Sequence, residues 1–130
     1  MNMVEDFKSH AADLFRRSYA MISEENRPLT PEELEQVYAS INILRSGNKT
    51  SVYLESPIRE GVALLHDHFR IKFGLPRGTD YAGLLEYTRD KQPFAGLNPT
   101  WESREPADVE FMAFGQLGVY DHALAGHLEI

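Results

Sequence analysis

Proline and glycine divide this chain into segments of helical length, and this division limits the fold more than any other feature. Between these residues, apolar side chains recur three and four positions apart, which is the spacing of one face of an α-helix. The pattern predicts a mostly α fold, a small single-domain bundle of about five helices. We expect these helices at residues 3–23, 31–46, 58–73, 81–90 and 107–126.

The second segment has the clearest start signal. Thr30 is a good N-cap, Pro31 follows at the first helical position, and Glu33 completes a capping box. The connection from the first segment is short, which favours antiparallel neighbours. We therefore expect the fold to begin with an antiparallel helical hairpin.

Two segments allow more than one structure. Residues 50–55 (TSVYLE) form either a short strand or a helical turn. Residues 107–126 are apolar on two sides as a helix, which is typical of a helix central to the core or in contact with a second chain; a β-hairpin is the alternative. The two apolar sides consist of Val109, Met112, Leu117, Tyr120 and Leu124, and of Phe111, Phe114 and His122.

Length, charge and cysteine content exclude several classes of protein. A chain of 130 residues fits one domain, 1–130, and the absence of cysteine excludes disulfides and thiolate metal sites. The net charge of −7 disfavours binding to nucleic acid or to anionic lipid. The sequence contains neither a signal-peptide pattern nor an apolar run of membrane-spanning length. We expect a cytoplasmic protein that binds neither nucleic acid nor membranes.

Four histidines lie in two short patterns near aspartates and are the candidate metal ligands. They are His66 and His68 beside Asp67, and His122 and His127 near Asp121. Imidazole and carboxylate are suitable ligands for zinc, nickel or iron. On a helix, however, His66 and His68 point about 200° apart. A metal site would have to form across elements, so surface or hydrogen-bonding histidines are the simpler interpretation, and we expect no cofactor.

Other catalytic patterns are missing from the sequence. No nucleophile elbow, phosphate-binding glycine loop or dinucleotide fingerprint occurs. The turn from Arg77 to Asp80 precedes a predicted helix, and its amides together with Arg77 could hold an anion. An ordinary helix cap explains the same residues.

Five of the fourteen aromatic residues lie in the last forty positions. The segment 93–101 (PFAGLNPTW) is long and apolar for a connection, so it either folds back on the core or offers anchors to a partner. The candidate interface residues are Phe94, Trp101, Phe111, Phe114, Tyr120 and His122.

These features favour binding over catalysis. We expect a non-enzymatic protein-interaction module, such as a small acidic regulator, adaptor or inhibitor. It would act on a protein partner, or by self-association, through a C-terminal aromatic surface. The alternatives are a small metal-dependent enzyme and a ligand-binding protein that uses the His/Asp cluster.

Overall fold

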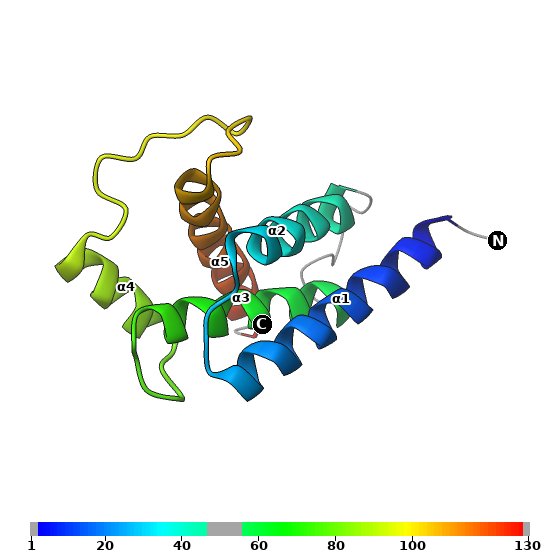
Figure 1. Ribbon diagram of the computed structural model, residues 1–130, viewed down its shortest axis with the longest axis horizontal. Coiled ribbons are helices and arrows are strands. Elements are labelled where there is room, and N and C mark those ends of the chain that lie inside the picture. Colours follow the sequence, from blue (N-terminus) through cyan, green and yellow to red (C-terminus); the bar gives the residue numbers. More distant parts are fainter. Residues whose placement is uncertain (1–2, 47–55, 129–130) are drawn as a thin grey trace.

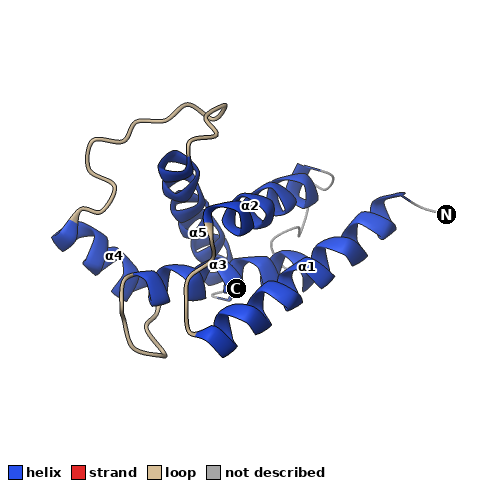
Figure 2. Cartoon of the chain, viewed as in Figure 1, coloured by secondary structure: helices blue, strands red, loops and turns tan. Residues whose placement is uncertain are grey.

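The computed structural model describes the backbone of residues 3–46 and 56–128, and the side chains of residues 9–44 and 58–120. Within these residues every regular element is a helix (Figure 2). The helices are α1 (Met3–Glu25), α2 (Pro31–Ser46), α3 (Ser56–Lys72), α4 (Tyr81–Lys91) and α5 (Pro106–Leu128). The predicted mostly α fold of about five helices is confirmed. The last segment is a helix and not a β-hairpin, whereas residues 50–55 lie outside the described part of the chain.

The start of α2 is held by the predicted capping box. The Glu33 N–H donates to the Thr30 hydroxyl oxygen at 3.2 Å, and the Thr30 N–H donates to Glu33 Oε1 at 2.8 Å. Arg27 donates to the same Glu33 oxygen at 2.9 Å and to the Pro28 carbonyl at 2.9 Å. The hydrogen bond from Arg27 is the main reason that the pKa of Glu33 lies below its ordinary value. The sharp entry into α2 is thereby fixed by one arginine and one carboxylate.

Helix α3 is the central element of the bundle. It contacts each of the other four helices, and α5 packs against both α2 and α3 (Figure 1). Helices α1 and α2 are in contact and run in opposite senses in this view, but α1 packs more extensively against α3. The antiparallel hairpin of the first two helices therefore stays a prediction. Helix α1 is packed more against α3 than against α2.

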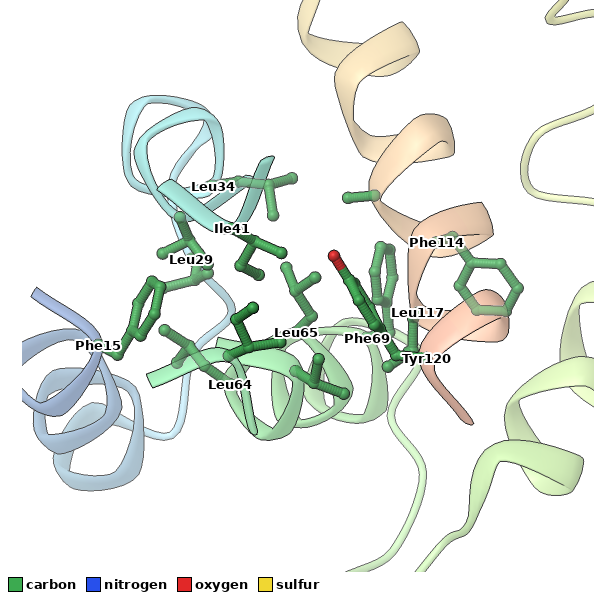
Figure 3. Close-up of a cluster of buried hydrophobic side chains, with 14 of the residues drawn as sticks. Phe15, Leu29, Leu34, Ile41, Leu64, Leu65, Phe69, Phe114, Leu117 and Tyr120 are labelled. Atoms are coloured by element: carbon green, nitrogen blue, oxygen red, sulfur yellow. The ribbon is translucent and has the colours of Figure 1, made fainter. Parts of the chain in front are cut away.

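The buried apolar side chains form one cluster to which all five helices contribute. Figure 3 shows Phe15 of α1, Ile41 of α2 and Leu65 of α3 converging from three sides, with Leu117 of α5 beside them. Gly61 of α3 makes this convergence possible, because a Cβ there would lie 2.9 Å from Ile41 Cγ1 and 3.0 Å from Phe15 Cε2. Helices α1 and α2 can approach α3 closely because this position carries no side chain.

None of the helices in the described ranges is both long and apolar enough to cross a membrane. Helix α5 is the most apolar of the five. Among its described side chains, Val109, Ala113, Phe114, Leu117 and Tyr120 are buried, and the helix packs against α2 and α3. Val119 is 48% exposed. The buried residues fit a position in the core, one of the two interpretations that the sequence allowed, and contact with a second chain stays a prediction.

Candidate functional site

The aromatic residues singled out from the sequence divide into a buried and an exposed group. Phe114 and Tyr120 lie in the core with 6% and 1% of their surface exposed, so neither can contact a partner unless the fold opens. Phe94 and Phe111 are half-buried and stack on each other, with ring centroids 5.4 Å apart. Trp101 is 78% exposed. The side chain of His122 lies outside the described residues.

The connection between α4 and α5 is half-buried near one end and exposed at the other. At its start, Phe94 folds back and makes ring contacts with Phe69, Phe73 and Phe114 of the core. At its end, Trp101 extends into solvent. A single loop closes one end of the bundle and presents a large aromatic side chain.

Trp101 borders a groove of about 520 Å³ between α2 and the start of α5. Helix α2 supplies Tyr38 and Ile43 to this groove, and α5 supplies Val109. Ile43 is 54% exposed, although three of the five described isoleucines are buried. The groove is lined by Glu35, Tyr38, Ala39, Asn42, Ile43, Trp101, Arg104 and Val109, and we call it the Trp101 groove.

Hydrogen bonds among residues 100–108 fix the backbone turn that carries Trp101. The Ser103 N–H donates to the Thr100 carbonyl at 3.0 Å and closes a turn around Trp101. The Ser103 hydroxyl donates to Asp108 of α5 at 2.6 Å, and the Glu105 N–H donates back to that hydroxyl at 3.4 Å. This turn is therefore anchored to the first turn of α5, so that less conformational entropy is lost when a partner contacts the tryptophan.

Charges of both signs flank the apolar floor of the Trp101 groove. Arg104 donates to the carbonyls of Glu102 and Ser103, at 3.2 and 3.1 Å, and forms no ion pair with a described residue. Glu35 on α2 is exposed and also has no ion pair in the described part of the chain. A partner can therefore be oriented by pairing with one or both of these charges.

His68 is buried and fully engaged in hydrogen bonds. Its Nδ1 accepts from the Leu29 N–H at 2.9 Å, so the ring proton is on Nε2, which donates to Glu110 Oε2 at 3.2 Å. Lys72 donates to the other oxygen of Glu110. Burial alone would raise the pKa of Glu110, but the hydrogen bonds from His68 and Lys72 outweigh it and lower that pKa. These side chains join α3 to α5 and to the loop before α2.

The described residues hold no group of three or more side chains suited to a metal ion. Both ring nitrogens of His68 are occupied, and His66 Nε2 donates to the Thr79 carbonyl at 2.6 Å. The side chains of His122 and His127 lie outside the described part of the chain. Within that part, His66 and His68 act as hydrogen-bonding links between elements, and His10 is exposed on α1.

The turn after α3 is an ordinary helix cap, one of the two interpretations of its sequence. Asp80 Oδ1 accepts from the Gly83 N–H at 2.9 Å and caps α4. A carboxylate therefore already occupies the N-terminus of this helix. Arg77, Gly78 and Thr79 of the same turn line a cleft together with His66.

The sequence contains a signal for Ile43 that the prediction of the buried face of α2 did not use. Ile43 lies off the face formed by Leu34, Val37, Ile41 and Leu44, and an apolar residue off the buried face is a candidate for contact outside the core. That Ile43 and Trp101, 58 positions apart, line the same groove had no signal in the sequence.

Comparisons with protein-family models, curated proteins and solved structures found no match to this chain.

Proposed function

We propose that this protein is a non-enzymatic interaction module that binds another protein through the Trp101 groove. The observation that carries the proposal is the exposure of Trp101, 78%, on a turn that is fixed by hydrogen bonds to α5. Tryptophan is among the residues that contribute most to binding energy at protein interfaces. An exposed tryptophan beside an exposed isoleucine is a costly arrangement for a surface that contacts only water.

The partner that fits this groove is an amphipathic segment of another protein with an apolar anchor flanked by charged residues, a basic one toward Glu35 and an acidic one toward Arg104. The apolar anchor would pack between Trp101, Ile43 and Tyr38. A basic side chain would pair with Glu35, and the net charge of −7 would attract a basic partner at long range. A regulator, adaptor or inhibitor acts in this way without chemistry of its own.

Trp101 is the chain's only tryptophan, so its fluorescence reports directly on the groove. We expect a partner that this protein captures in a pull-down to shift the tryptophan emission to shorter wavelength once it is purified and added. The reason is that binding removes the indole from water. Trp101→Ala and Ile43→Asp should abolish capture and leave the melting temperature close to that of the wild type. A second copy of this chain in the groove would instead appear as a dimer that Ile43→Asp dissociates, and would exclude a separate partner.

The matched control is Leu85→Asp on α4. Leu85 is 45% exposed, close to the 54% of Ile43, and lies away from the groove. Capture by this variant should equal that of the wild type. If Trp101→Ala and Leu85→Asp retain the same partners, the Trp101 groove is not the binding surface and the proposal fails.

A further inference from the structure

A second cleft, of about 530 Å³, lies on another part of the bundle. It is formed by the C-terminal ends of α1 and α3 and the loop that leads to α4, which lie near one another in Figure 1. Its size is within the range of pockets that bind small molecules. The cleft is lined by Tyr19, Ile22, Ser23, Asn26, His66, Asp67, Arg70, Ile71, Arg77, Gly78 and Thr79, and we call it the His66 cleft.

The polar wall of the His66 cleft has more positive than negative charge, in a chain that is acidic as a whole. Arg70 and Arg77 are its two cations and Asp67 is its only carboxylate. The side chain of Arg70 is only 14% exposed, and Asp67 is its ion-pair partner, at 3.4 Å. Arg77 forms no ion pair or hydrogen bond with a described residue. The cleft therefore presents a positive charge that this part of the chain does not neutralise.

Hydrogen-bond donors remain available on this wall. Arg70 uses Nε toward Asp67 and Nη1 toward the Leu75 carbonyl, at 3.4 and 3.3 Å, and its other N–H groups have no partner among the described residues. A guanidinium this buried is stabilised by an anion that accepts those hydrogen bonds. The bond from His66 to the Thr79 carbonyl ties the loop that carries Arg77 to α3.

The lining of the cleft also includes apolar and aromatic residues. Tyr19 at the end of α1 is 48% exposed and Ile71 of α3 is half-buried, whereas Ile22 is fully buried. An exposed aromatic side chain and a partly exposed isoleucine suit the organic part of a ligand and not a bare inorganic ion. The cleft thus combines cationic and apolar groups.

We propose that the His66 cleft binds a small organic anion, whose carboxylate or phosphate group pairs with Arg77 and Arg70 and whose apolar part packs against Tyr19. Binding here is independent of the Trp101 groove. It adds a ligand site through which a small molecule can act on α1, α3 and the loop before α4, the three elements that the ligand would touch.

The test is an amide and aromatic NMR titration of the wild-type protein with phenyl phosphate, benzoate, inorganic phosphate and neutral benzyl alcohol. Phenyl phosphate or benzoate should shift the signals of Gly78, Thr79 and Tyr19 together and saturate. Benzyl alcohol and inorganic phosphate should bind more weakly, because each lacks one half of the ligand. Arg77→Gln should weaken binding by about tenfold or more, since a charge-assisted hydrogen bond is lost.

Arg104→Gln is the matched control, because Arg104 is also an exposed arginine without an ion pair in the described part of the chain but lies in the Trp101 groove. It should leave the affinity unchanged. Equal losses in both variants would show attraction by net charge alone and would overturn the site. An absence of localised, saturating shifts with both aromatic anions would also overturn it, whatever the Trp101 groove binds.

Discussion

The imidazole of His68 accepts a hydrogen bond from the backbone N–H of Leu29, which lies 39 positions earlier in the chain, at 2.9 Å. Leu29 is itself a core residue on the loop between α1 and α2. This bond satisfies a buried backbone donor that no helix could satisfy. The position of the loop on α3 therefore depends on which nitrogen of His68 carries the proton.

Substitutions at His68 should separate its two hydrogen bonds. His68→Asn places an acceptor near the position of Nδ1 and should be tolerated best. His68→Gln places a donor nearer Glu110 but leaves the Leu29 N–H unpaired, which should cost about 1–3 kcal/mol of unfolding free energy. His68→Ala should cost more than either. Urea denaturation measures the order, and equal losses in all three variants would show that the volume of the ring matters and its bonds do not.

Gly61→Ala should destabilise the bundle. The added Cβ would lie too close to Ile41 and Phe15, and overpacking of this kind costs about 1–3 kcal/mol. Alanine regains up to about 1 kcal/mol through its higher helix propensity, so we expect a net loss.

The control for this substitution is Gly115→Ala in α5, where nothing lies within 4 Å of the new Cβ. It should stabilise the protein by up to about 1 kcal/mol. The midpoints of urea unfolding measure both changes. A stabilised Gly61→Ala variant would contradict the close packing of α1 and α2 on α3.

The stability of the protein should decrease in acid, partly through Glu110. Its pKa is below the ordinary value of 4.5 in the folded state, so its ionised form stabilises the fold. This contribution is complete above about pH 4.5 and is lost as the pH falls through the lower pKa of the folded state. Glu110→Gln should therefore flatten the decrease of melting temperature below pH 4.5.

Part of the acid sensitivity should remain in Glu110→Gln, because the pKa of Glu33 is lowered as well. Glu105→Gln is the control, since Glu105 is exposed and forms no ion pair with a described residue. Its melting temperature should follow that of the wild type at every pH. Parallel acid profiles of Glu110→Gln and wild type would show that the carboxylate of Glu110 does not contribute.

Phe111→Asp should lower stability without affecting the Trp101 groove. Phe111 is half-buried and stacks on Phe94, and an aromatic pair of this kind contributes about 0.5–1.5 kcal/mol beyond the burial of its area. We expect a lower melting temperature, a helical circular dichroism spectrum and unchanged capture of the partner. Loss of capture in a variant that stays folded would extend the interface to this side of α5.

The sequence predicted the helices because their signals are local. The capping box at Thr30 and Glu33 and the Asp80 cap depend on residues within one turn of each other. The interface residues were harder to predict, because the burial of Phe114 and the exposure of Trp101 depend on where the loop after α4 crosses the bundle. The partners of His68 were not predictable for the same reason, since Leu29 and Glu110 are 39 and 42 positions away.

The packing of α5 against α2 and α3 has a consequence for how the chain folds during synthesis. The rings of Phe69 and Phe114 meet 5.0 Å apart, and Gln116 donates to Asn42 across 74 positions. While residues before Pro106 emerge from the ribosome, the apolar faces of α2 and α3 lack their cover. The nascent chain is therefore prone to aggregation until α5 has been synthesised and packs onto these faces. Chaperone dependence in this protein should therefore be greatest immediately before α5 is made.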